Sequence, residues 1–207
     1  MIKVENCDVW GFGHAIRGMR NPLNSWSRSD SEIYPWDEGS SKLGENDLDL
    51  MRRLYMAGSE HRKYLRQIMV SMDITAPLYW WKEADTYKVG TVANSCSTMH
   101  KIHSKEFTLD DFSTDHLTEY SVEQLQSLID WLNMCRTNYN LDKEKEYWWQ
   151  MIQLLPSSYN QKRTITMNYE NVMNIIHQRE NHKLDEWQDF VKTLKKLPYI
   201  EDIRGGI

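Results

Sequence analysis

Arg179 is the residue whose position in the sequence points most directly to chemistry. On a helix, where successive residues lie about 100° apart, it shares one face with three apolar residues, Val172, Ile175 and Ile176. A stripe of three amides runs beside that face: Asn171, Asn174 and Gln178. Two interpretations stay open. Arg179 is a helix-end arginine that packs its stem on the core and binds the last carbonyls, or it is a partly buried cation for an anionic or enolate-like ligand.

A second set of residues has the types that bind zinc. Cys96, His100 and His103 stand at i, i+4 and i+7, so they share a face if residues 95–104 are helical, and Asp110 or Asp111 would add an oxygen ligand. The same spacing also arises by chance, with histidines that bond locally or line a polar pocket, and we predict no metal. Cys96 alone is either an activated nucleophile or an inert small side chain.

Apolar periodicity and helix capping predict the elements that hold these residues. Alternating apolar residues predict a strand over 68–75, and Pro77 opens a short aromatic helix that ends near Glu83. Asn46 is the expected N-cap of a helix over 47–57. A capping box of Ser121 and Gln124 begins a helix that ends near Thr137. The pattern also predicts helices over 143–155, 169–178 and 183–197, and an extended segment over 163–167. Turn-forming residues over 21–44 predict a long surface loop within a single domain over 1–207.

Composition limits the classes of function. The chain has 25 Lys and Arg against 30 Asp and Glu, a formal charge of −5, which argues against duplex nucleic acid as a partner. No run of about 18 apolar residues predicts a membrane span. Three cysteines that are far apart in the sequence fit a reducing compartment, and we expect a cytoplasmic protein.

Gly11-Phe12-Gly13 lacks the later glycine of a Rossmann phosphate loop. With 9 Trp, 11 Tyr and 4 Phe, aromatic rings fill the core or line a pocket for a planar ligand.

Two blocks of the sequence, about 47–101 and 150–198, resemble the flavin-dependent thymidylate synthase (ThyX) family. The second block has the family's Leu-Pro, a Thr two residues before an Asn, a second Asn six residues later and an Arg five beyond: here these are Leu155, Pro156, Thr166, Asn168, Asn174 and Arg179. By that resemblance Asn168 and Asn174 contact FAD. Arg179 would lie against the pyrimidine of dUMP and stabilise negative charge on the ring as its C5 attacks.

The first block keeps an apolar strand, Ala76-Pro77 and a short aromatic helix, but its signature is degraded. The family's Arg-His-Arg, seven residues and Ser become Thr86-Tyr87-Lys88, seven residues and Cys96. A later signature Arg is Thr98, and a phosphate-binding Arg falls on Ile152 or Gln153, so charge is lost at both places. The resemblance assigns nucleotide binding to Lys88, Thr91, Cys96, Ser97 and Arg179. It assigns cofactor binding to His61, Arg62, Arg66, Lys82, Asn168 and Asn174. The alternative interpretation of the first three is a solvated basic face that binds no cofactor.

The resemblance implies an α+β fold in which helices pack on an antiparallel β-sheet, and a homotetramer with nucleotide sites between subunits. In the family's reaction NADPH reduces FAD, methylenetetrahydrofolate supplies a methylene to C5 of dUMP, and the flavin supplies the hydride. Two hypotheses follow. The chain is a methyltransferase acting on dUMP or a related pyrimidine nucleotide, or it is a catalytically inactive ThyX-fold protein that binds a nucleotide. Loss of the Arg-His-Arg triplet favours the second, and retention of Asn168, Asn174 and Arg179 favours the first.

Overall fold

A computed structural model describes residues 2–34 and 41–205. The chain divides into two compact units. The large unit comprises Val4–Asp73, Tyr87–Ala93 and Thr164–Ile207, and the small unit comprises Met1–Lys3, Ile74–Thr86 and Asn94–Arg163. Each unit is described separately below. The expected single domain over 1–207 stays a prediction.

The sheet has four strands in the order β1-β2-β4-β3. Their bounds are Lys3–Trp10 for β1, Met69–Pro77 for β2, Thr91–Ser95 for β3 and Asn160–Asn168 for β4. Two cross-strand hydrogen bonds give the direction of the central pair. Thr166 Oγ1 lies 3.1 Å from Ser71 Oγ, and Thr164 Oγ1 donates to Asp73 Oδ1 at 2.6 Å, so residue numbers rise along β4 as they fall along β2. With helices packed on this antiparallel sheet, the expected α+β class is confirmed.

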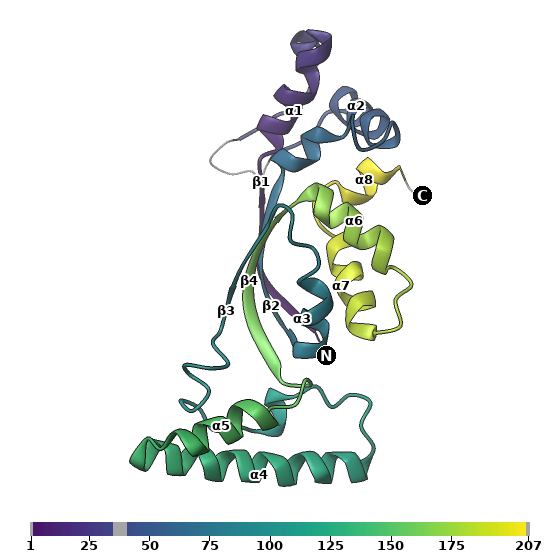
Figure 1. Cartoon of the computed structure of the whole chain (residues 1–207). Helices are drawn as coiled ribbons and strands as arrows, with labels where there is room; N and C mark the ends of the chain where they lie inside the picture. Colours follow the sequence, from purple (N-terminus) through teal and green to yellow (C-terminus); the bar gives the residue numbers. More distant parts are fainter. Residues whose placement is uncertain (1, 35–40, 206–207) are drawn as a thin grey trace. The chain divides into compact units, whose positions relative to one another are not determined.

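The helices of the large unit are α1 (Phe12–Arg20), α2 (Glu45–Met56), α6 (Tyr169–Arg179), α7 (Asp185–Lys195) and α8 (Ile200–Arg204). Within this unit, α6, α7 and α8 lie on one side of the strands (Figure 1). Helix α7 buries an i, i+3, i+4, i+7 set of side chains: Trp187, Phe190, Val191 and Leu194. This apolar face packs α7 into the core and fixes the position of Trp187, which the functional site uses below.

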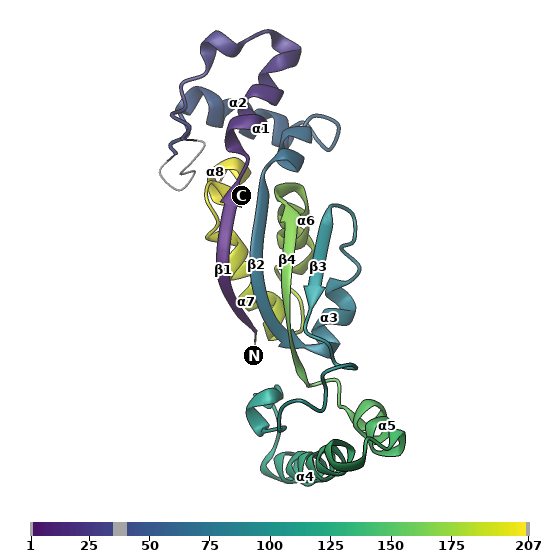
Figure 2. The same ribbon diagram turned by 90° about the vertical axis from the view of Figure 1, so that its left-hand side faces the viewer.

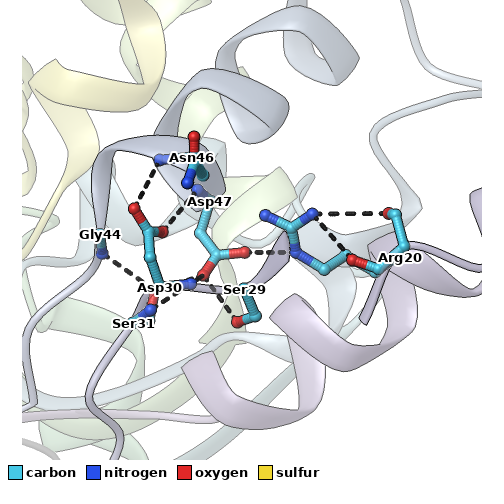
Figure 3. Close-up of polar contacts among 8 residues, drawn as sticks. Arg20, Ser29, Asp30, Ser31, Gly44, Asn46 and Asp47 are labelled. Atoms are coloured by element: carbon cyan, nitrogen blue, oxygen red, sulfur yellow. Dashed lines mark hydrogen bonds and ion pairs between the residues drawn. The ribbon is translucent and has the colours of Figure 1, made fainter. Parts of the chain in front are cut away.

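Asp47 links the loop after α1 to the start of α2 (Figure 3). Its carboxylate is buried, accepts a hydrogen bond from Arg20 Nε at 2.6 Å, and accepts four more from Ser29, Asp30 and Ser31. Burial alone would raise the pKa of Asp47, but these hydrogen bonds outweigh it and hold the pKa below its ordinary value. The expected loop over 21–44 is therefore tied to α2 through residues 29–31, while residues 35–40 of it lie outside the described part of the chain.

The predicted N-cap of α2 is wrong. The helix begins at Glu45, and Asn46 lies inside its first turn. The N-cap position is Gly44, which has no side chain, and the capping oxygens come from outside the helix: Asp30 accepts from the backbone N–H groups of Asn46 and Asp47 at 3.0 and 3.2 Å. Local sequence pointed to the nearest Asn, whereas the cap comes from a carboxylate 16 residues upstream.

The small unit contains α3 (Leu78–Ala84), α4 (Glu119–Asp142) and α5 (Lys145–Leu154). Helices α4 and α5 pack side by side, and α4 is seen nearly end-on in Figure 2. Their shared core is made of Ile102, Phe107, Phe112, Leu125, Ile129, Leu132, Cys135 and Met151. The expected capping box at Ser121 is wrong by one turn: Thr118 is the N-cap, and its Oγ1 accepts from the Ser121 N–H at 3.3 Å. None of the helices in the described residues is long and apolar enough to cross a membrane.

Candidate functional site

The guanidinium of Arg179, at the end of α6, lies beside two aromatic rings of the large unit that also contact each other. Its Cζ is 4.8 Å from the ring centroid of Trp187 on α7, which is fully buried, and 5.6 Å from that of Tyr87. Arg179 Nε donates to Tyr87 Oη at 2.8 Å, and the Tyr87 hydroxyl donates in turn to Gln178 Oε1 at 2.9 Å. We call these four residues the Arg179 cluster. The two rings and the hydrogen bond restrict the orientation of this planar guanidinium far more than solvent would.

The turn that follows Tyr87 is attached to the first turn of α6. Thr91 N donates to Lys88 O at 3.3 Å and closes the turn Lys88–Thr91. Asn171 Nδ2 donates to the carbonyl of Val89 at 2.5 Å and to Thr91 Oγ1 at 2.9 Å. Both ends of α6 therefore contact the segment 87–91: Asn171 near its beginning and Arg179 at its end.

Gly90 is the residue that lets this turn approach α6 so closely. Its φ is +71°, and a Cβ placed there would lie 2.5 Å from Asn168 Nδ2. Only glycine adopts such a φ without steric cost. Asn168 is the N-cap of α6, because its Oδ1 accepts from the Asn171 N–H at 3.0 Å.

Five of the residues predicted for ligand binding belong to this part of the large unit: Lys88, Thr91, Asn168, Asn174 and Arg179. Arg179 is half-buried, Lys88 is exposed in the turn, and Asn174 is half-buried on α6. Asn168 and Thr91 already have hydrogen-bond partners in the turn and the helix cap. The structure thus brings together, on α6 and one turn, two amides, a hydroxyl and two cations.

Arg62 and Arg66, predicted to bind the cofactor, both face Glu170 at the start of α6. Arg66 Nη2 donates to Glu170 Oε1 at 3.3 Å and its Nε donates to Oε2, while Arg62 Nε lies 3.6 Å from Oε1. Arg62 also places its guanidinium 5.5 Å from the ring centroid of Tyr55. Two guanidinium groups face Glu170, and Glu60 also interacts electrostatically with Arg66, so these two arginines and two carboxylates balance in formal charge. The N-terminus of α6 beside them favours an anion.

His61, the third of these predicted residues, lines a groove of about 540 Å³ in the large unit. The groove runs from the end of α1 to residues 60–67, and its apolar lining includes Met19, Leu23 and Leu54. His61 itself is exposed. The groove is also lined by polar side chains, among them Glu60 and Lys63, and a mixed apolar and polar lining suits a flat ring with polar substituents.

The other predicted residues, Lys82, Cys96 and Ser97, belong to the small unit and are exposed. Cys96 pairs with β4 through its backbone only: its N–H donates to Lys162 O at 2.9 Å and its carbonyl accepts from Gln161 Nε2 at 2.7 Å. Ser97 Oγ accepts from the N–H groups of Met99 and His100. Ser95 ends β3 and residues 96–104 contain no helix, only bends and a turn, so the helical face assumed for Cys96, His100 and His103 does not form. Among the described residues no three His, Cys, Asp or Glu side chains form a metal-binding group.

Sequence reasoning missed Tyr87, Trp187 and Glu170 as parts of this site. Tyr87 is 92 residues from Arg179, and no local pattern links the two. Trp187 lies within the predicted helix over 183–197, and that prediction gives it no role of its own. Glu170 is an acid in the first turn of a helix, which is the one sequence signal that could have pointed to it. Acids are common at that position for structural reasons alone, so the signal does not by itself indicate a site.

No protein-family model matches the sequence, and no curated protein matches it. Solved structures match it over nearly its whole length. A ThyX flavin-dependent thymidylate synthase from Helicobacter pylori, complexed with FAD and dUMP, matches with a TM-score of 0.68 at 17% identity over 98% of this chain and 97% of that one. A second structure of Helicobacter pylori ThyX with FAD and dUMP gives a TM-score of 0.69 at 18% identity over 99% and 97%. The chain therefore has a ThyX-like fold over its whole length.

Proposed function

We propose that this chain binds FAD and a pyrimidine nucleotide, dUMP or a close relative, and acts as a thymidylate synthase-like methyltransferase. The observation that carries the proposal is the whole-length likeness to structures that hold FAD and dUMP. The residues that resemble the family's binding residues on α6, Asn168, Asn174 and Arg179, support it, because two of them flank the same turn in the large unit.

The residues beside α6 fit a flavin dinucleotide. Within the described residues, Arg62 Nε is buried and has no hydrogen-bond partner, although it lies 3.6 Å from Glu170. A buried guanidinium N–H without an acceptor is costly, and a phosphate oxygen is an acceptor of the right charge. The two guanidinium groups of Arg62 and Arg66 support a diphosphate there, and the groove lined by His61 supports a ring.

Bound FAD would supply the hydride, with NADPH as its reductant and methylenetetrahydrofolate as the one-carbon donor. The residues of the chain bind, orient and polarise. Arg179 would contact the pyrimidine and stabilise the negative charge that develops as C5 becomes a nucleophile. Tyr87 and Trp187 would hold its guanidinium in one orientation, and Lys88, with Thr91, Cys96 and Ser97, would bind the nucleotide. Lys82 would be a cofactor contact.

A second candidate function is nucleotide binding without turnover. Thr86-Tyr87-Lys88 carries one cation where the family signature carries Arg-His-Arg, and this observation favours it. A nucleotide phosphate held by one lysine is bound less tightly and less rigidly than by a bidentate arginine.

The proposed protein is a cytoplasmic homotetramer with its nucleotide sites between subunits. Cys7, Cys96 and Cys135 are free thiols, which suits a reducing compartment.

Two measurements on the purified protein test the proposal. Bound flavin would give a yellow protein with the absorbance bands of an isoalloxazine, and turnover would release tritium from [5-³H]dUMP when NADPH and methylenetetrahydrofolate are supplied. Flavin with tritium release supports the enzyme. Flavin or dUMP binding without tritium release supports the second candidate, and failure to bind either FAD or dUMP contradicts both.

A further inference from the structure

Four basic side chains of the small unit form no ion pair within the described residues. They come from the segment that follows β3, from the second half of α4 and from the residue that ends it, and we call them the α4 basic cluster: Lys101, His103, Arg136 and Lys143. Lys105 of the same segment does pair, with Asp111 Oδ1 at 2.7 Å. The acids nearest in sequence, Glu106, Asp142 and Glu144, are exposed and pair with none of the four in the part of the chain that the structure describes.

The segment from His103 to Phe107 crosses α4 beside Arg136. At one end of this segment, Asn140 Nδ2 donates to the His103 carbonyl at 3.1 Å. At the other end, Asn133 Oδ1 accepts from the Phe107 N–H at 2.9 Å and Asn133 Nδ2 donates to the Phe107 carbonyl at 2.8 Å. At about 100° per residue, Arg136 lies within roughly 60° of both asparagines on the helix surface. The segment therefore runs over the helix face that carries Arg136.

Two nitrogen atoms of the cluster are buried without a hydrogen-bond partner among the described residues: Arg136 Nε and His103 Nδ1. The His103 ring packs against Tyr139 with the ring centroids 4.9 Å apart, and Lys143 Nζ lies 5.1 Å from the centroid of the same tyrosine. Burial, with the positive charges of Lys143 and Lys101, lowers the pKa of His103, which places the imidazole near both lysines. A buried guanidinium N–H without an acceptor is costly, so this region favours a ligand that accepts hydrogen bonds.

The end of α4 accounts for only one of these cations. Lys143 is the C-cap residue, where the helix dipole and the last carbonyls favour a positive charge. Arg136 lies almost two turns before Asp142, the last helical residue, and the dipole effect falls off within the last turn. Water would satisfy the N–H group of Arg136 but would not neutralise its charge. An anion does both.

We propose that the α4 basic cluster binds a phosphate group. A phosphate monoester carries about −1.5 to −2 charges at pH 7 and has three strong acceptor oxygens. One such group can accept from a guanidinium, an imidazole and an ammonium at once, whereas a carboxylate has two oxygens and a single charge. The group belongs either to a separate phosphate compound or to a bound nucleotide, and its chemistry is the same in both. Binding of inorganic phosphate here does not depend on the proposed function.

Calorimetric titration with inorganic phosphate, at an ionic strength held constant with chloride, tests the site. The wild type should bind phosphate, and Arg136→Gln should weaken that binding at least about tenfold, as for loss of a hydrogen bond between charged groups. Arg53→Gln is the matched control, because it removes the same charge from an exposed arginine on α2 that pairs with Asp49. It should leave phosphate affinity unchanged. No saturable binding to the wild type in the millimolar range, or equal affinity in a folded Arg136→Gln protein, overturns the proposal.

Two exposed lysines keep the site testable if Arg136→Gln does not fold. Lys101→Gln and Lys143→Gln replace side chains outside the core of the small unit, so both proteins should keep the wild-type thermal transition. Each should weaken phosphate binding several-fold. Acetate should bind to the wild type at least about tenfold more weakly than phosphate, because it has fewer oxygens and less charge. Unchanged phosphate affinity in both lysine variants, or acetate binding as tight as phosphate, would contradict the assignment.

Titration with dUMP, in the presence and absence of saturating phosphate, distinguishes the two sources of the phosphate group. Competition that is lost in Arg136→Gln would show that the cluster binds the phosphate of the nucleotide. Undiminished dUMP affinity in saturating phosphate would show that it binds a separate phosphate compound. Both results support the site. A protein that binds phosphate through Arg136 but binds neither dUMP nor FAD would contradict the proposed function and still support this site.

Discussion

Arg179 is the residue on which the proposed chemistry depends most. Its guanidinium lies against Trp187 and Tyr87 and is oriented through Nε. In the enzyme, Arg179→Ala should lower turnover by roughly 10²–10³, as when one preorganised charge-stabilising group is removed. Arg179→Lys should rescue poorly, because a point charge does not reproduce the planar guanidinium. Tritium release measures both. Loss of the thermal transition in Arg179→Ala would instead identify a structural helix-end arginine.

Tyr87 is a positioning residue in this arrangement, since it reaches the substrate only through Arg179. Tyr87→Phe keeps the ring beside the guanidinium and removes the hydroxyl that joins Arg179 Nε to Gln178 Oε1. We expect dUMP affinity to fall by about tenfold, the effect of one hydrogen bond to a charged group. In an Arg179→Ala background the same substitution should change affinity little. Calorimetric titration of the four proteins gives the coupling, and equal effects in both backgrounds would contradict it.

Lys88 is the cation that remains in the degraded signature, and it is exposed in the turn Lys88–Thr91. Lys88→Ala should weaken dUMP binding by about 1–3 kcal/mol, the range for a lost hydrogen bond to a charged group. Exposed Lys145 on α5, which belongs to no proposed site, provides a control of equal charge in Lys145→Ala. Unchanged dUMP affinity in a folded Lys88→Ala protein would show that the phosphate binds elsewhere.

At the scale of elements, the contact between the turn Lys88–Thr91 and α6 depends on Gly90. Gly90→Ala should destabilise the protein by about 1–3 kcal/mol, since a side chain would meet both a positive φ and Asn168. Gly58→Ala is the control: Gly58 also has a positive φ, +104°, but a Cβ there would meet nothing within 4 Å. Denaturant unfolding should show the larger loss for Gly90→Ala. Equal losses would mean that the close approach to Asn168 contributes nothing.

The link between the loop after α1 and the start of α2 should make stability depend on pH. Hydrogen bonds hold the pKa of Asp47 below its ordinary value of 3.8, so the folded protein binds this proton more weakly than the unfolded chain. The contribution is present above about pH 4 and is lost as pH falls through the folded pKa. Asp47→Asn should lower stability at pH 7 and flatten its decline below pH 4. Urea unfolding at several pH values measures both.

The elements that sequence predicted correctly are those whose signals are local. Strand β2 alternates apolar residues, Pro77 precedes α3, and α6 has the apolar face of Val172, Ile175 and Ile176. Strand β1, by contrast, is mostly exposed and reads Lys-Val-Glu-Asn-Cys-Asp-Val-Trp, so periodicity could not find it. Strand β3 is exposed at four of its five residues and was missed for the same reason.

The residues of the candidate site also divide into those with a local sequence signal and those without one. The residues on α6 were accessible to sequence because their helix is regular and amphipathic. The partner that orients Arg179 was not, since the hydrogen bond that Arg179 donates to Tyr87 spans 92 residues. The helix assumed for Cys96, His100 and His103 failed because Ser97 accepts from two of the following N–H groups and forms a turn instead.

At the scale of the whole molecule, a ligand that binds only the folded protein must raise its stability. At a dUMP concentration 100 times the dissociation constant, the gain is about 2.7 kcal/mol, or a rise in Tm of roughly 5–10 °C for a chain of this size. We expect this rise for wild type with dUMP and a much smaller one with deoxyuridine, which keeps the pyrimidine and the sugar and lacks the phosphate. Arg179→Ala should reduce the dUMP-dependent rise. It should also lower the ligand-free Tm, because it loses the hydrogen bond to Tyr87 and the contact with the Trp187 ring, so each rise is measured from the ligand-free Tm of the same protein. Differential scanning fluorimetry measures all of these, and it does so whether or not the protein turns dUMP over. A wild-type Tm that is insensitive to dUMP over the millimolar range, with and without added FAD, would contradict nucleotide binding and with it both proposed functions.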